Sequence, residues 1–170
     1  RQFRTSGDYH RFHDLDPTVV VLTNLEPDHL DFHGTWEGLR GSVDRFVASL
    51  PADGVLLYCA DDEGARDVAA RSDRPSFGYG PVERPLHLPG RHNATNSGAA
   101  MATVASLGGD AEKALAALAA FRGSERRLQT LREGEIAVAD DYAHHPTEIR
   151  VTLQALRERH PDRRLVVVFQ

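Results

Sequence analysis

Short apolar runs alternate with amphipathic stretches over the first half of the chain. Residues 18–23 and 55–59 are apolar runs that are too short for helices and are followed by polar residues, so they indicate buried strands. Between them, apolar side chains recur at steps of three and four over residues 36–50, which predicts an amphipathic helix. A third strand is expected at residues 76–79, after a short helix. This β-α-β-α-β order is typical of a parallel sheet covered by helices.

Two Ala-rich stretches come next in the chain. Residues 96–107 and 111–121 are separated by two glycines and a capping aspartate, which predicts a helical hairpin. Glycine and serine then interrupt the pattern within residues 122–127. We therefore expect a first domain over residues 1–121 and a second one over residues 122–170.

The pattern after this boundary predicts β-β-α-β. Residues 128–131 and 136–139 flank a turn-like Glu-Gly pair and suggest a β-hairpin. Pro146 suits the first turn of a helix. N–H groups in that turn have no partner within the helix, so the N–H that proline lacks costs no hydrogen bond. A last strand is expected at residues 165–169.

Composition narrows the functional classes. The chain has 170 residues, of which 41% are hydrophobic, enough to bury a core. Its 20 basic and 25 acidic residues give a net charge of -5, and no basic run is present, so nucleic-acid binding is not expected. No stretch approaches the roughly 20 apolar residues that span a bilayer. The single Cys59 excludes a disulfide framework and fits a reducing cytosol.

Both ends of the sequence look cut. The chain begins with Arg1 rather than methionine, and it stops at Gln170 directly after an apolar run. The expectation is an internal piece of a longer protein.

A first polar cluster follows the first predicted strand. Glu26, Asp28, His29 and Asp31 offer carboxylate and imidazole groups within one loop, a suitable set for a divalent cation that bridges nucleotide phosphates. In open α/β sheets, ligands gather at the carboxyl ends of strands. The alternative is a loop whose acidic residues cap the next helix.

A second cluster, residues 140–146, lies between a predicted strand and a helix start. Free N–H groups and the dipole at such a start attract anions. The acids of this cluster can accept bonds from ribose hydroxyls, and its histidines can bind or polarise a ligand. Zinc binding by the paired histidines is an alternative, although no cysteine is near to complete a strong site.

Two further groups have a functional and a structural interpretation. Asn93 and Asn96 follow a Pro-Gly turn and could read the edge of a base or could simply cap a helix. Arg126 and Arg127, at the expected domain boundary, could reach a phosphate or could be ordinary surface arginines.

Taken in order, the segments TNLEPDHLD, PGRHNATN, FRGSERRLQ and DDYAHHPTEI resemble the Mur ligase family. The resemblance spans nearly the whole chain, and DDYAHHPTE is most like the members that join L-alanine to UDP-N-acetylmuramate. It implies an α/β fold: part of a parallel-sheet, P-loop-type ATPase domain, followed by an incomplete Rossmann-like domain. It also implies ATP-dependent amide formation through an acyl phosphate, with ATP and Mg2+ as cofactors.

The resemblance also implies residue roles. His29, with Glu26, would hold the magnesium ion. The adenine would be met by His92, Asn93 and Asn96.

In the second domain, Arg126 or Arg127 would approach the γ-phosphate, and Asp141 would hold the ribose. Tyr142 and His144 would line the place where the incoming amino acid meets the acyl phosphate. Domain closure would bring the two sets together.

The sequence also departs from the family pattern. It has no GxxxxGK[ST] phosphate loop, and the link over residues 79–89 is short for the family. We therefore expect the 170-residue chain to be inactive alone. Two alternatives stay open: a ligase that recycles murein peptides onto the same sugar nucleotide, and a non-catalytic nucleotide-binding module.

Overall fold

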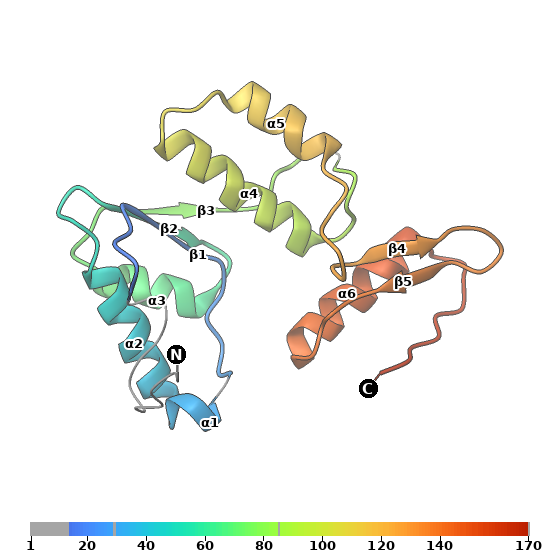
Figure 1. Ribbon diagram of the computed structural model, residues 1–170, viewed down its shortest axis with the longest axis horizontal. Coiled ribbons are helices and arrows are strands. Elements are labelled where there is room, and N and C mark those ends of the chain that lie inside the picture. Colours follow the sequence, from blue (N-terminus) through green and yellow to red (C-terminus); the bar gives the residue numbers. More distant parts are fainter. Residues whose placement is uncertain (1–13, 29, 85, 170) are drawn as a thin grey trace, which may run out of the picture. The chain divides into compact units, whose positions relative to one another are not determined.

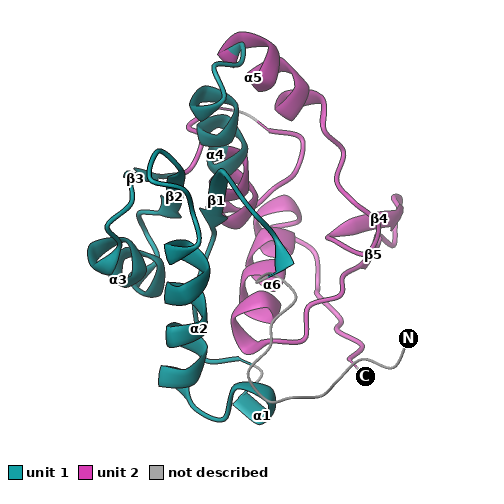
Figure 2. Cartoon of the chain, turned by 60° about the vertical axis from the view of Figure 1, so that its left-hand side comes forward, with its two compact units in different colours: residues 1–80, 98–110 teal, residues 81–97, 111–170 magenta. Residues whose placement is uncertain are grey.

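The computed structural model describes residues 14–28, 30–84 and 86–169, which form two compact units. Unit 1 comprises residues 1–80 and 98–110, and unit 2 comprises residues 81–97 and 111–170 (Figure 2). The predicted α/β class is confirmed, since both units contain helices and strands and the sheet of unit 1 is parallel (Figure 1). Within the described ranges, no helix is long and apolar enough to cross a membrane.

Unit 1 is built on a three-stranded parallel sheet. Its strands are β1 (Val19–Leu22), β2 (Val55–Cys59) and β3 (Ser76–Tyr79), in that spatial order. In the registers, Val20 lies opposite Leu56, and Leu57 lies opposite Phe77. The three predicted strands and their parallel order are therefore confirmed.

Both faces of the central strand are buried. On one face, the core cluster comprises Val20, Val47, Leu50, Leu56 and Val68, to which α2 (Trp36–Ala48) and α3 (Glu63–Arg71) contribute. On the other face, Leu57, Cys59 and Tyr79 pack with Ala99 of α4 (Arg91–Ser106). Successive residues of a strand point to opposite faces, so burial on both sides requires the continuous apolar run seen in β2.

Side-chain caps set where the helices of unit 1 begin. The Thr35 hydroxyl accepts a hydrogen bond from the Gly38 N–H at 3.0 Å, and the Asp62 carboxylate accepts one from the Ala65 N–H at 2.7 Å. These bonds satisfy N–H groups that have no partner inside the helix. The short helix α1 (Leu30–His33) precedes α2.

Unit 2 contains α5 (Ala111–Ala120), β4 (Gln129–Arg132), β5 (Val138–Asp140) and α6 (Pro146–Arg159). β4 and β5 pair antiparallel, which confirms the predicted hairpin, and Pro146 occupies the first turn of α6 as predicted.

Two sequence predictions in the second half of the chain are wrong. No strand forms at residues 165–169, where Val168 is 94% exposed, because no neighbouring strand accepts its backbone hydrogen bonds. α4 begins at Arg91 rather than at residue 96. Gly90, with a φ of 94°, makes the turn into this helix, and the Asn93 side chain donates to the Pro89 carbonyl at 2.8 Å.

Two glycines inside helices of unit 1 should respond in opposite directions to substitution by alanine. A Cβ on Gly98 would overlap the Gly80 carbonyl, whereas a Cβ on Gly41 would meet only the end of Arg45, at 3.7 Å. We expect Gly98→Ala to lower the free energy of unfolding by about 1–3 kcal/mol. Gly41→Ala should raise it by about 0.5–1 kcal/mol, because alanine loses less backbone entropy. Urea unfolding followed by circular dichroism measures both, and a stabilising Gly98→Ala would contradict the packing described.

Candidate functional site

The loop after β1 is fixed within unit 1 by a carboxylate from the start of α3. Asp62 Oδ1 accepts the Leu25 N–H at 3.0 Å as well as its helix-capping bond. The Tyr79 hydroxyl donates to the Leu22 carbonyl at 3.2 Å. Burial, together with Cys59 and Asp62, raises the pKa of Tyr79 to about 12, so this hydroxyl remains a donor at neutral pH. The carboxyl end of β1 is therefore held in one conformation.

The predicted metal ligands belong to this loop. Glu26 is half-buried, and His29 lies outside the described residues. Among the residues that the structure describes, no three His, Cys, Asp or Glu side chains come together as a metal site, which also gives no support to the zinc alternative.

Unit 2 brings together four of the predicted site residues: Arg126, Arg127, Tyr142 and His144, which we call the Arg-Tyr-His cluster. The Arg126 guanidinium lies 4.7 Å from the centre of the Tyr142 ring, and that of Arg127 lies 6.0 Å from it. The His144 ring meets the Tyr142 ring edge-on, with centroids 5.5 Å apart. All four side chains are exposed, so they offer cationic and aromatic groups to a ligand in solution.

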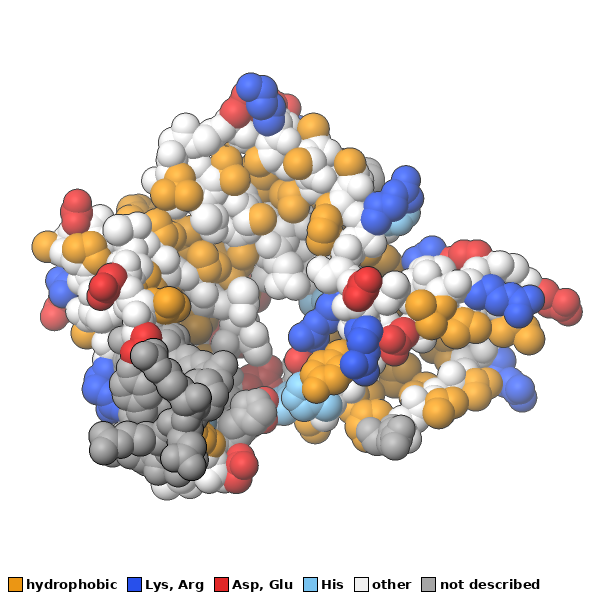
Figure 3. All heavy atoms as spheres, viewed as in Figure 1, with side chains coloured by type: hydrophobic (Ala, Val, Ile, Leu, Met, Phe, Trp, Pro, Cys, Tyr) orange, Lys and Arg blue, Asp and Glu red, His pale blue; other side chains and the backbone are white. Residues whose placement is uncertain are grey.

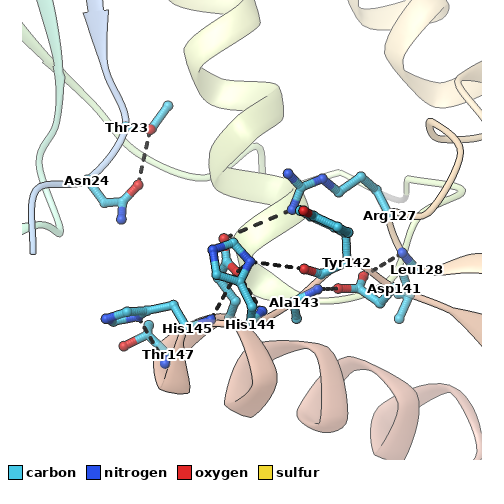
Figure 4. A network of polar contacts seen from close by, with 11 residues as sticks. Thr23, Asn24, Arg127, Leu128, Asp141, Tyr142, Ala143, His144, His145 and Thr147 are labelled. Atoms are coloured by element: carbon cyan, nitrogen blue, oxygen red, sulfur yellow. Dashed lines mark hydrogen bonds and ion pairs between the residues drawn. The ribbon is translucent and has the colours of Figure 1, made fainter. Parts of the chain in front are cut away.

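The Arg-Tyr-His cluster depends on the carboxylate of Asp141. Its two oxygens accept the backbone N–H groups of Leu128, at 2.6 Å, and of Ala143, at 2.8 Å (Figure 4). The Tyr142 N–H donates to the Arg126 carbonyl at 2.9 Å. Two of these bonds, Leu128 to Asp141 and Tyr142 to Arg126, join the segment before β4 to the segment after β5, which places both arginines beside the tyrosine.

The backbone at the arginines is strained. Arg126 and Leu128 have φ angles of 55° and 49°, in the left-handed region that residues other than glycine rarely adopt. Such conformations persist where the surroundings determine them. Here Leu128 is 4% exposed and bonded to Asp141, and the Arg126 N–H donates to the Gln129 side chain at 2.9 Å.

The start of α6 is closed by its own side chains. His145 Nδ1 accepts the Thr147 N–H at 3.3 Å, and Glu148 Oε2 accepts the N–H groups of His144, at 3.1 Å, and of His145, at 3.3 Å. The prediction that free N–H groups attract an anion here is therefore wrong, because these donors are already used.

Glu148 is a residue that the sequence reading missed. Burial favours its neutral form, but the two backbone N–H groups and the nearby His144 and Arg127 outweigh burial and lower the pKa of the carboxyl. The signal available in the sequence was a residue that can cap a helix, His145, followed three positions later by a glutamate.

The predicted adenine-contacting residues lie in the first two turns of α4. His92 is half-buried, Asn93 is held by the Pro89 carbonyl, and Asn96 is exposed. Burial lowers the pKa of His92 below its ordinary value of 6.5, although Asp141 and Glu158 act in the opposite direction. His92 is therefore neutral at physiological pH and close enough to Asp141 to feel its charge.

Acidic side chains lie beside the arginines of the Arg-Tyr-His cluster. Arg126 Nε is 3.6 Å from Asp140 Oδ2, and Arg127 Nη1 is 4.0 Å from Glu148 Oε1. The space-filling view shows basic, acidic and histidine side chains gathered near the start of α6 (Figure 3). Exposed pairs of this kind contribute about 0–1 kcal/mol each to stability, so they orient side chains more than they stabilise the fold.

Two family models match the chain. Residues 4–81 match the Mur ligase middle domain, and residues 126–170 match the Mur ligase glutamate ligase domain. The second match contains the whole Arg-Tyr-His cluster, Asp141 and Glu148.

Curated relatives with similar sequences are UDP-N-acetylmuramate–L-alanine ligases. The enzyme of Arthrobacter sp. (strain FB24) is 41% identical over 94% of this chain and 40% of its own length. That of Desulforamulus reducens is 37% identical over 92% of this chain and 40% of its own length. The chain thus spans about two fifths of the length of the curated relatives it matches.

Solved structures show the same fold. The UDP-N-acetylmuramate-alanine ligase of Thermotoga maritima is 27% identical and covers 88% of this chain and 40% of its own, with a TM-score of 0.69. A murein peptide ligase of Psychrobacter arcticus is 25% identical and covers 90% of this chain and 37% of its own, with a TM-score of 0.63.

Unit 2 should lose stability as the pH falls below about 6.5, because the folded state binds a proton at His92 less readily than the unfolded chain does. The contribution of His92 is fully present above pH 6.5 and is lost as the pH falls toward the lowered pKa. Replacing His92 by glutamine should make the dependence of unfolding free energy on pH shallower between pH 5 and 7.

Urea titrations at a series of pH values measure this dependence. His87→Gln, at an exposed histidine of the same unit, is the control and should keep the wild-type dependence, since His92 is intact. An unchanged slope in His92→Gln would show that burial does not hold this histidine neutral.

Proposed function

The chain belongs to the Mur ligase family, and we propose that it forms part of an enzyme that uses ATP to join L-alanine to UDP-N-acetylmuramate. The choice of L-alanine is supported by relatives of 37–41% identity that carry this activity in their names. The murein peptide ligases among the solved structures are 24–25% identical, which makes them the weaker candidates for the same chain. The single buried thiol of Cys59 is compatible with a reducing cytoplasm.

The observation that carries the proposal is the Arg-Tyr-His cluster. Two exposed guanidinium groups beside one aromatic ring suit a phosphate or a carboxylate, because a guanidinium presents paired N–H donors in a planar fork. We assign Arg126 and Arg127 to the γ-phosphate of ATP. Tyr142 and His144 would line the position where the L-alanine amino group approaches.

The nucleoside would be held by residues of the same unit. We assign His92, Asn93 and Asn96 to the adenine, and Asp141 to a ribose hydroxyl. Each oxygen of Asp141 already accepts one backbone N–H, and a carboxylate oxygen has a second lone pair for a ribose donor. Asp141 would then serve both the backbone and the ligand.

The proposed reaction has two steps. A carboxylate oxygen of UDP-N-acetylmuramate attacks the γ-phosphorus of ATP, the bond to the bridging oxygen breaks, and ADP leaves with an acyl phosphate remaining. The L-alanine nitrogen then attacks the acyl carbon, phosphate departs, and a proton leaves the nitrogen to give the amide. Positioning of the reactants and neutralisation of phosphate charge would supply most of the rate enhancement.

Magnesium would neutralise phosphate charge in this reaction, and Glu26 supplies a carboxylate of the kind that it prefers. The described residues do not contain a complete ligand set, and His29 lies outside them. We therefore derive no step through the metal.

A nucleotide titration tests this assignment. We expect Mg·ADP to shift the backbone amide resonances of Asn93, Asn96 and Ala143 in two-dimensional NMR spectra, because these residues surround the proposed adenosine site. Mg·UDP is the matched control and should shift them less, since it carries the same phosphates on a different base. Equal shifts for both nucleotides would contradict the adenine assignment.

Turnover by the chain alone should be absent. The sequence has no GxxxxGK[ST] element to cradle the ATP phosphates. We expect the purified 170-residue chain, with ATP, magnesium, UDP-N-acetylmuramate and L-alanine, to release no phosphate above the background without L-alanine. A colorimetric phosphate assay measures this, and release that depends on L-alanine would refute the expectation.

A further inference from the structure

Glu148 contacts two members of the Arg-Tyr-His cluster through different oxygens. Oε2 accepts the backbone N–H groups of His144 and His145, and it lies 3.5 Å from His144 Nδ1. Oε1 faces Arg127 Nη1 at 4.0 Å. The carboxylate is thus fixed by the backbone at one oxygen and directed toward a guanidinium by the other.

Helix capping explains only part of this arrangement. A glutamine at position 148 could accept the same two backbone N–H groups, since glutamate and glutamine both serve at this place in a capping box. The contacts with His144 and Arg127 are different, because they place a negative charge beside two side chains that carry or can carry a positive one. Burial of the carboxyl does not prevent its ionisation, since its pKa is lowered.

The surroundings of His144 also select one tautomer. His144 Nδ1 lies 3.1 Å from the Tyr142 carbonyl oxygen and 3.5 Å from Glu148 Oε2, and both atoms are acceptors. A proton on Nδ1 satisfies them, whereas a lone pair on Nδ1 would face two oxygens. Nε2 is then left with its lone pair available to a ligand.

We propose that Glu148 is a positioning residue, whose carboxylate holds His144 as the Nδ1–H tautomer beside Tyr142 and holds Arg127 facing the same surface. This inference rests on the proposed function, because it assigns to Glu148 the arrangement of the groups that receive the substrate phosphate or carboxylate. Preorganised side chains of this kind lose less rotational freedom when a ligand binds.

Electrostatics and positioning predict opposite results for Glu148→Gln. Loss of a negative charge makes the surface more positive, so electrostatics alone would tighten the binding of an anion. If Glu148 positions Arg127 and His144, the same substitution weakens binding in spite of the added positive charge. The sign of the change therefore separates the two explanations.

The experiment compares the wild-type chain with Glu148→Gln. Glu133→Gln is the matched control, because it removes the same charge from the same unit, where Glu133 pairs with Arg159 at 2.6 Å. Long-range 1H–15N correlation spectra of the ligand-free proteins report the His144 tautomer. We expect Nδ1–H to predominate in the wild type and in Glu133→Gln. In Glu148→Gln we expect a larger Nε2–H population, because a neutral amide oxygen attracts the Nδ1 proton less strongly than a carboxylate does.

The affinity for Mg·ADP, measured by calorimetry, is the second readout. We expect Glu148→Gln to bind about two- to fivefold more weakly than the wild type, the range that one exposed ion pair contributes. An unchanged tautomer in Glu148→Gln, or an affinity that is unchanged or tighter, would overturn the inference.

Two further outcomes distinguish a failure of the inference about Glu148 from a failure of the proposed function. If the wild-type chain does not bind Mg·ADP, the nucleotide site fails, and the tautomer spectra alone decide whether Glu148 positions His144. Glu148→Asp keeps the charge on a shorter side chain and should lie between the wild type and Glu148→Gln in tautomer population. If Glu148→Asp instead matches Glu148→Gln, a negative charge is not sufficient by itself and the reach of the glutamate side chain is also required.

Discussion

The Asp141 carboxylate is the constraint on which the Arg-Tyr-His cluster of unit 2 depends. It accepts backbone N–H groups from Leu128 and Ala143, so a single side chain joins the segments on either side of the β4–β5 hairpin. Arg126 and Leu128 adopt left-handed conformations, which cost on the order of 1–3 kcal/mol each. The buried Leu128 side chain and the bonds to Asp141 offset that cost. Asp141 thus acts together with the Tyr142–Arg126 backbone bond in keeping the arginines beside Tyr142.

Unit 1 uses the same device at the end of its first strand. Asp62 caps α3 and also accepts the Leu25 N–H, which fixes the loop that carries Glu26. In both units, therefore, an aspartate that bonds to the backbone fixes a loop that carries predicted site residues. This division of roles is physically reasonable, because a carboxylate has about four acceptor positions and backbone N–H groups occupy only some of them.

Periodicity was enough to predict most elements, because β1 and β2 of unit 1 are short apolar runs and the helices have repeated apolar positions. The prediction from periodicity failed where contacts with other parts of the chain determine the local structure. Residues 165–169 are apolar, but a strand also needs a neighbour to take its hydrogen bonds. The start of α4 was placed too late, because the turn at Gly90 and the bond from Asn93 leave no trace in the pattern. Arg126, Arg127, Tyr142 and His144 were found from the motifs, whereas Glu148 became visible only through its contacts.

Because the start of α6 is closed by side chains, the proposed site of unit 2 would bind an anion through side chains rather than through backbone N–H groups. His145 and Glu148 occupy N–H groups that an open helix start would present to a phosphate. The remaining donors are guanidinium groups on long side chains, and ordering such a side chain costs about 0.5–1.5 kcal/mol of binding energy. Stacking of Arg126 on Tyr142 and the placing of Arg127 near Glu148 reduce that cost before a ligand arrives. A surface built in this way requires arginine, because lysine has no planar group to lie over the ring while donating two parallel hydrogen bonds.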